Sequence, residues 1–238
     1  MTVVYPHASL PTMSDPKIEH PEDFTAHKWC NDLIFDPLVT RVHQRHMFGE
    51  GDKWNSLFTR TLFTNDAVRA FLNLYKPGKG QRRAVDRSSM LTGEPPKLGT
   101  FAPSDYEKEL ARQTAKEDVQ HDLEDPQAPE NIVLVSVGRY LDGAVGRLHG
   151  GFTASLLDQT MGALLMHYYQ SSHATSELRV KYKKAIGTPC ILKARARISR
   201  EVGRWIESVA WIEDGEGTVY AEGWGSFVLD KLEPTAKM

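Results

Sequence analysis

One long stretch of the chain is almost entirely apolar and has the spacing of a helix. Between Gly150 and about Tyr169, apolar residues recur at intervals of three and four positions, and no proline interrupts them. The only charged residue in this stretch is Asp158, and no other charge lies between Arg147 and Glu177. A lone acid in so apolar a helix is costly unless it is paired or used. The pattern therefore predicts a buried helix that encloses one carboxylate with a functional role.

The hydrophobic pattern on either side of this helix is that of β-strands. A β-branched run precedes the helix, and four segments in which apolar and polar residues alternate follow it. These five predicted strands are 131–137, 178–183, 190–199, 205–213 and 218–229. Short turns between them, such as the Asp-Gly-Glu-Gly turn at 214–217, favour an antiparallel meander. Since the helix is apolar on nearly all sides, we expect an α+β fold in which a curved antiparallel sheet wraps around one long central helix.

The first 130 residues have a weaker pattern and divide into three parts. Prolines at positions 6, 11, 16 and 21 predict a flexible tail over residues 1–21. Residues 22–78 predict an N-terminal helical extension, and residues 79–130 a polar insert. The predicted helices are 24–33, 37–47, 53–62 and a charged stretch at about 105–122, while 64–74 is compatible with helix or strand. The main domain is then expected over residues 131–232.

Composition and charge exclude several classes of protein. The 238 residues include 29 Lys and Arg against 31 Asp and Glu, a balance that gives no reason to expect nucleic acid as a partner. No apolar run reaches the ~18–20 residues that span a bilayer, and the N-terminal residues lack the features of a signal or transit peptide. Cys30 and Cys190 have no metal-ligand spacing and exclude a disulfide framework. We expect a cytoplasmic protein that holds no metal and no cofactor.

The start of the predicted helix has a second chemical feature. Two glycines, Gly150 and Gly151, follow His149. Glycines at this position let a ligand approach bare backbone N–H groups at the positive end of the helix dipole. Asp158 follows Gly150 by eight residues, a little over two turns, so both can lie near one face of the helix at different heights.

These residues resemble the hotdog-fold acyl thioesterases of the His-Gly-Gly type. The matching signature runs from Gly143 to Asp158, with a Leu-acid-Gly turn, His-Gly-Gly, Ala-Ser and the acid, and continues as Gly162 and the Val-Lys-Tyr-Lys-Lys run at 180–184. The group includes bacterial phenylacetyl-CoA thioesterases, mammalian mitochondrial long-chain acyl-CoA thioesterases and fungal homologues associated with secondary metabolism. The resemblance covers about residues 130–230 and implies the hotdog fold. The character of the N-terminal extension suggests a fungal homologue.

The resemblance also implies roles for individual residues. In the family, the acid nine residues after the histidine is the general base or nucleophile, which is Asp158 here. The glycine amides at the helix start form the oxyanion hole, which implies Gly150 and Gly151. A threonine seven residues before the tyrosine of the Tyr-Lys strand corresponds to Thr175, which would orient the water. The family further implies a homodimer or a dimer of dimers, in which the acid and the oxyanion donors come from opposite subunits and a monomer is inactive.

A thioester suits a site with so few groups. Its leaving thiolate compares with a Cys thiol, whose pKa is about 8.5, so its departure needs little protonation. The site must supply N–H donors for the developing oxyanion and one base or nucleophile. Asp158 can activate a water or attack directly to form a mixed anhydride, and the sequence leaves both routes open.

Other polar residues near the motif have less defined roles. His149 is interpreted mainly as structural, with a ring that bonds to the backbone and fixes the turn. Ser155 is a substrate-contact candidate whose hydroxyl is expected to bond back to a carbonyl rather than to act as a nucleophile. Arg179, Lys181 and Lys183 form a basic strand face that either meets the phosphates of coenzyme A or is simply solvated.

We therefore expect a thioester hydrolase that acts on an acyl-CoA or acyl-carrier-protein thioester, with polyketide or fatty-acid-derived secondary metabolism as a candidate setting. Two alternatives stay open. A hotdog hydratase or dehydratase would use Asp158 and His149 to move protons on an acyl thioester. A non-catalytic protein would bind the acyl thioester without turnover.

Overall fold

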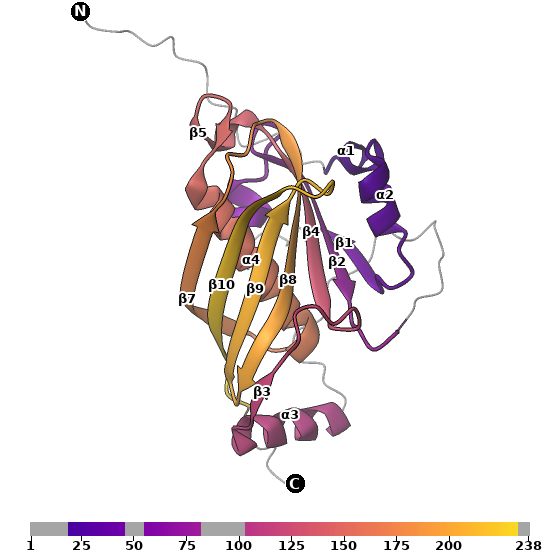
Figure 1. Ribbon diagram of the computed structural model, residues 1–238, viewed down its shortest axis with the longest axis vertical. Helices are drawn as coiled ribbons and strands as arrows, with labels where there is room; N and C mark the ends of the chain where they lie inside the picture. Colours follow the sequence, from indigo (N-terminus) through magenta and orange to yellow (C-terminus); the bar gives the residue numbers. More distant parts are fainter. Residues whose placement is uncertain (1–18, 46–54, 82–102, 233–238) are drawn as a thin grey trace, which may run out of the picture.

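An antiparallel sheet that curves around one long helix, α4 (Gly150–Tyr169), forms the centre of the computed structural model, which describes residues 19–45, 55–81 and 103–232 (Figure 1). In their order across the sheet, the strands are β1 (Arg41–Gln44), β2 (Val68–Lys76), β4 (Glu130–Val137), β8 (Cys190–Val202), β9 (Trp205–Glu213), β10 (Val219–Leu229) and β7 (His173–Tyr182). A short strand, β3 (Asp118–Gln120), pairs with β8. The predicted α+β fold, its long helix and its five strands are confirmed.

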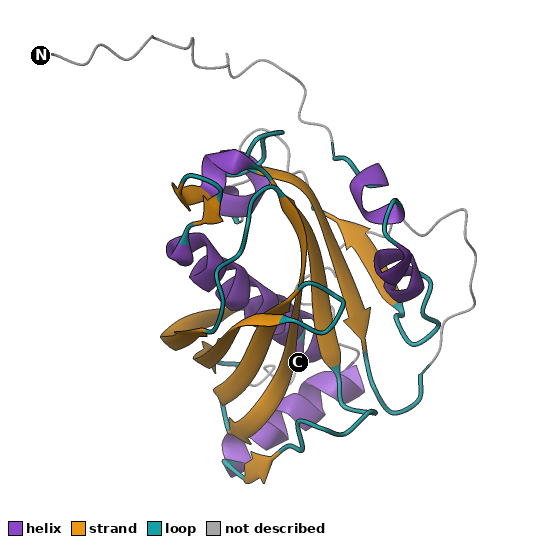
Figure 2. Ribbon diagram, turned by 45° about the horizontal axis from the view of Figure 1, so that its top comes forward, coloured by secondary structure: helices purple, strands orange, loops and turns teal. Residues whose placement is uncertain are grey.

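Helix α4 lies along the concave face of the sheet, and two glycines of β10 allow its close approach (Figure 2). A Cβ atom at Gly223 would lie 3.1 Å from Leu157 Cδ1, and one at Gly225 would lie 3.0 Å from Met161 Cε. Both Leu157 and Met161 are fully buried. Burial of each such side chain contributes roughly 1.5–3 kcal/mol, so a larger residue on β10 would separate the helix from the sheet at a cost in stability.

Two short helices cover the other face of the sheet beside β1 and β2 (Figure 1). These are α1 (Glu22–Thr25) and α2 (Lys28–Ile34). Their buried residues Phe24 and Ile34 join a second apolar cluster with strand residues such as Leu72 and Leu134. Strand β4 is buried at every position because α4 covers one of its faces and this cluster covers the other.

The N-terminal half differs from its prediction. The helix predicted over 37–47 is wrong, because Arg41–Gln44 forms β1 and pairs with β2. The ambiguous segment 64–74 runs into strand β2, which is buried on both faces and so has no periodicity that separates strand from helix. Both strands belong to the main sheet, so the helical extension predicted over 22–78 does not continue through them, and we propose that the main domain includes β1 and β2.

The other predicted helices are shorter than expected. Of 53–62, the π-helix η1 (Leu57–Thr61) is observed, and residues 46–54 lie outside the described residues. The charged helix is α3 (Pro103–Ala115), which ends before residue 122 because 118–120 pair with β8. Residues 82–102 of the predicted insert also lie outside the described residues.

A buried ion pair ties the N-terminal segments together. Arg45 Nε lies 2.8 Å from Glu19 Oε1, and the same guanidinium donates to the carbonyls of Phe58 at 2.9 Å and Val68 at 3.0 Å. Burial lowers the pKa of Arg45 to about 10, so the guanidinium keeps its charge at pH 7. Glu19, near the end of the predicted tail, is thus anchored, whereas residues 1–18 lie outside the described residues.

His167 on α4 makes stability depend on pH. Its buried ring stacks on Tyr75 at 4.8 Å and lies 5.1 Å from the ring of His43. Burial holds the pKa of His167 well below its usual value, and the charges of His43 and Arg41 act in the same direction. The unfolded chain, in which His titrates near 6.5, therefore binds more protons in acid than the folded chain does.

We expect the free energy of unfolding to fall as the pH drops below about 6.5, with His167 contributing up to about 1.4 kcal/mol per pH unit. The variant His167→Gln cannot titrate and should have a flatter dependence in urea unfolding between pH 7 and 5. His27→Gln, which removes an exposed imidazole, is the matched control and should behave as the wild type. Equal slopes in His167→Gln and wild type would contradict the assignment.

Candidate active site

His149 caps the start of α4. Its backbone is extended, with φ −67° and ψ 131°, and its ring Nδ1 accepts a hydrogen bond of 2.8 Å from the Gly151 N–H. Its own N–H donates to the Leu141 carbonyl at 2.8 Å. Because Nδ1 is the acceptor, the neutral ring carries its proton on Nε2. The backbone-bonded role predicted for His149 is therefore observed.

The peptide unit between Gly150 and Gly151 is held at both of its polar ends. The Gly151 N–H is bound to His149, and the Gly150 carbonyl accepts a hydrogen bond of 2.9 Å from the Tyr182 hydroxyl. Of the two predicted oxyanion donors, the Gly151 amide is thus occupied. The Gly150 N–H makes no hydrogen bond within the described residues, since the first N–H of a helix has no acceptor within the helix. Tyr182 was not among the predicted site residues.

Asp158 lies next to Thr175, the residue that the resemblance implied would orient a water. The Thr175 hydroxyl donates to Asp158 Oδ1 at 2.9 Å, and β7 runs antiparallel to α4 beside it. The predicted burial of Asp158 is wrong, because the residue is only half-buried, on the side of α4 where the sheet ends at β7. The neighbours on this face are small: Gly151, Ser155 and Gly162. The Ser155 hydroxyl donates to the Gly151 carbonyl at 2.9 Å, the back-bond expected from the sequence.

The Asp158 carboxylate and the free Gly150 amide are far apart within one chain. Gly150 and Asp158 are separated by eight residues, which is about 12 Å along a helix. A reacting carbonyl needs an oxyanion donor within about 3 Å and a base or water within a similar distance. On one α4 helix, the Gly150 N–H and the Asp158 carboxylate are therefore too far apart to contact the same carbonyl.

His173 is a neighbour of this site that the sequence analysis missed. It begins β7 two residues before Thr175. Its Nε2 occupies the space over Gly162, where a Cβ atom would lie only 2.9 Å away. This contact explains why position 162 is a glycine. The alternation of side chains in a strand was the signal that could have placed His173 on the same face as Thr175.

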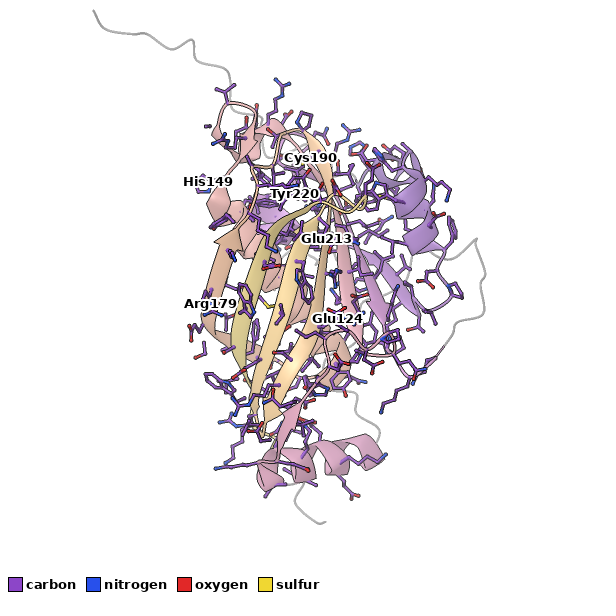
Figure 3. The ribbon with its side chains drawn as sticks, viewed as in Figure 1. Glu124, His149, Arg179, Cys190, Glu213 and Tyr220 are labelled. Atoms are coloured by element: carbon purple, nitrogen blue, oxygen red, sulfur yellow. The ribbon has the colours of Figure 1, made fainter. Side chains whose placement is uncertain are left out.

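The residues of the predicted basic row differ in what they contact. The guanidinium of Arg179 lies 4.8 Å from the ring of Trp224, on the outer face, because the glycines on either side of Trp224 face α4. Lys181 is exposed on the same strand and makes no ion pair within the described residues. Lys183 is paired with Glu222. Figure 3 shows Arg179 on β7, away from His149 at the start of α4.

A cavity of about 320 Å³ opens beside the start of α4. Gly150 and Tyr182 line it, together with three cations, Arg147, Lys183 and Lys184. Of the basic row, Lys183 thus lies close to the free Gly150 amide. Arg179 lines a separate cavity of about 240 Å³ on the outer face.

Two searches for other site types gave negative results in the described ranges. No cluster of three or more His, Cys, Asp or Glu side chains there could hold a metal ion. None of the described helices has the length and apolarity needed to cross a membrane.

Comparison with known proteins points to one family. Residues 145–221, from the hairpin before α4 to β10, match the family model of the thioesterase superfamily. The resemblance to the hotdog-fold thioesterases is confirmed. Mouse acyl-coenzyme A thioesterase THEM5 is 28% identical over 116 residues, which cover 45% of this chain and 44% of the mouse protein. Xenopus laevis acyl-coenzyme A thioesterase THEM4 is 33% identical over 73 residues, which cover 31% and 32%. The chain thus spans less than half the length of either relative.

Solved structures show a partial likeness. A Bacillus halodurans protein crystallised with CoA is 25% identical, covers 58% of this chain and 100% of its own, and has a TM-score of 0.40. A hypothetical thioesterase of Streptococcus pneumoniae, also with coenzyme A, is 17% identical, covers 48% and 89%, and has a TM-score of 0.40.

The cap on α4 can be tested by its effect on stability. Removing a helix N-cap costs about 1 kcal/mol, so His149→Ala should lower the free energy of unfolding in urea by that amount. His149→Asn retains a capping side chain and should lose less. If His149→Ala is as stable as the wild type, the ring does not cap the helix in solution.

Proposed function

We propose that this protein is an acyl thioesterase that hydrolyses an acyl thioester to a free acid and a thiol. The observation that carries the proposal is the Asp158 carboxylate, hydrogen-bonded to Thr175 on a half-exposed face of α4. It lies within the segment that matches the thioesterase superfamily. Both curated relatives are named acyl-coenzyme A thioesterases, which favours an acyl-CoA as substrate. Acyl-carrier-protein substrates, a secondary-metabolic setting and a cytoplasmic location stay predictions.

Asp158 would supply the base or the nucleophile. With one carboxylate oxygen held by the Thr175 hydroxyl, the other is available to take a proton from a water that attacks the thioester carbonyl. The C–S bond then breaks and the thiolate leaves. In the alternative route the Asp158 carboxylate attacks the thioester carbonyl, the C–S bond breaks and the thiolate leaves, and a mixed anhydride with Asp158 remains, which water hydrolyses to release the acid and restore Asp158.

The Gly150 N–H would stabilise the oxyanion, and we propose that it does so for the Asp158 of a second copy. The separation of about 12 Å on one helix prevents the two groups from serving one carbonyl. Two α4 helices that pack antiparallel through their small-residue faces would bring each Gly150 toward the other copy's Asp158. Strand β7 lies at the end of the sheet, so its outer edge is free within the described residues to pair with a second copy. The proposed enzyme is therefore a homodimer with two shared sites, whether or not dimers pair further.

The carrier arm of the substrate would occupy the cavity beside Gly150. Three cations around this cavity, Arg147, Lys183 and Lys184, suit the phosphates of coenzyme A. Arg179 and Lys181, on the outer face, are assigned no part in this contact. A phosphorylated arm bound in this cavity would place the thioester at the N-terminus of α4. There the Gly150 N–H makes no hydrogen bond within the described residues.

The first test measures free-thiol release from short, long and aromatic acyl-CoAs. Asp158→Asn should abolish release while the protein remains folded. Gly150→Pro removes the N–H at a position where proline is tolerated, the first of a helix, and should lower kcat about 10²–10³-fold. Gly150→Ala, whose Cβ would lie 3.5 Å from the Tyr182 ring, keeps the amide and is the matched control.

Each outcome of this test has a meaning. Equal release by Asp158→Asn and wild type would remove Asp158 from the mechanism. A hydroxyacyl or enoyl product without free thiol would favour a hydratase or dehydratase. Acyl-CoA binding without turnover, unchanged in Asp158→Asn, would indicate a binding protein.

The second test asks whether sites are shared between copies. Asp158→Asn and Gly150→Pro should each be inactive as pure proteins, but half of randomly mixed dimers contain one intact site. Co-expressed or refolded mixtures should therefore recover about one quarter of wild-type activity. No recovery in a mixture that sizing and mass analysis prove to contain the mixed dimer would contradict the shared site.

A further inference from the structure

His173 and Thr175 contact adjacent turns of α4. Thr175 binds Asp158, and His173 lies over Gly162, which is four residues and about one turn further along the same helix. Because the two residues are separated by two positions in β7, their side chains point to the same side of the strand. On this side of β7, the imidazole of His173 is therefore the neighbour of Thr175, which binds Asp158.

Two carboxylates lie near His173, and no cation pairs with it within the described residues. The edge of the Phe227 ring packs against the imidazole with 5.6 Å between ring centres. Asp158 faces His173 from α4, and Asp230 faces it from the segment after β10, where its carboxylate binds Ser172. Burial lowers the pKa of His173, while the Ser171 backbone and the two carboxylates act in the opposite direction. The ring is thus neutral at pH 7 and takes up a proton in acid.

We propose that His173 is a positioning residue for Asp158, because the imidazolium that forms over Gly162 in acid favours the ionised carboxylate one helical turn away. The proposal rests on the function proposed above, in which Asp158 must be ionised to act. A positive charge near a carboxylate opposes its protonation. His173 would extend the activity of the enzyme toward lower pH without touching the thioester.

The sign of the effect can be read from the pH profile of kcat/KM for acyl-CoA hydrolysis. In His173→Gln no cation can form, so the acid limb should move to higher pH by about 0.5–1 unit for such a partly exposed pair. His173→Lys carries a cation and should keep the limb at or below its wild-type position. Gly162→Ala forces the ring away from the helix and should shift the limb in the same direction as His173→Gln. His27→Gln, far from the site, is the control for a lost imidazole.

A purely structural role for His173 would lower kcat/KM by the same factor at every pH and leave the acid limb where it is. An unmoved limb in His173→Gln therefore overturns the proposal.

A second measurement does not depend on activity. The titration of His173 can be followed by NMR in the full chain with labelled histidine, assigned by its absence from His173→Gln. Coupling is reciprocal, so Asp158→Asn should lower the pKa of His173 by about 0.5–1 unit. An unchanged titration overturns the pairing alone, whereas failure of the wild type to release thiol from any acyl-CoA overturns the proposed function.

Discussion

The rise per residue of an α-helix fixes the separation between the two ends of the candidate site. Gly150 and Asp158 are eight residues apart on α4, so about 12 Å of helix separates their backbone positions. An aspartate side chain is too short to span that distance. In the proposed dimer, the face that carries Asp158 must therefore stay open toward the second copy. The sheet accordingly ends at β7, and the residues around Asp158 on this face are small.

The remaining surface of α4 must be packed closely against the sheet. A helix with one open face must be held firmly on its others, and the sheet does this by approaching closely at the β10 glycines. Leu157, the residue before Asp158, and Met161, three residues after it, are fully buried there. The same turn of α4 thus contributes core packing on one side and the proposed catalytic carboxylate on the other. This arrangement fixes the direction in which Asp158 points, since its neighbours cannot move without exposing apolar surface.

Long elements with a strong pattern could be predicted from the sequence, whereas short elements and most contacts between distant residues could not. Helix α4 and strands β7 to β10 have a clear pattern with few breaks, and β4 is a β-branched run. Strand β1 has four residues, too few for a period, and exists because it pairs with β2. Asp158 and Thr175 could be found through a shared motif, but the degree of burial of Asp158 depends on where the sheet ends. The occupied Gly151 amide and the contact of His173 with Gly162 depend on ring orientations, which no pattern of residue types encodes.

Strand β7 holds both halves of the proposed chemistry. Tyr182 near its end fixes the Gly150 carbonyl, while Thr175 near its start fixes the Asp158 carboxylate. In the proposed dimer these two groups belong to different sites, because each Gly150 serves the other copy's Asp158. If β7 of one copy shifted along α4, the positions of groups in both sites would therefore change together. The strand would act as a mechanical link through which a substrate bound in one site alters the geometry of the other, and the two sites would not turn over independently.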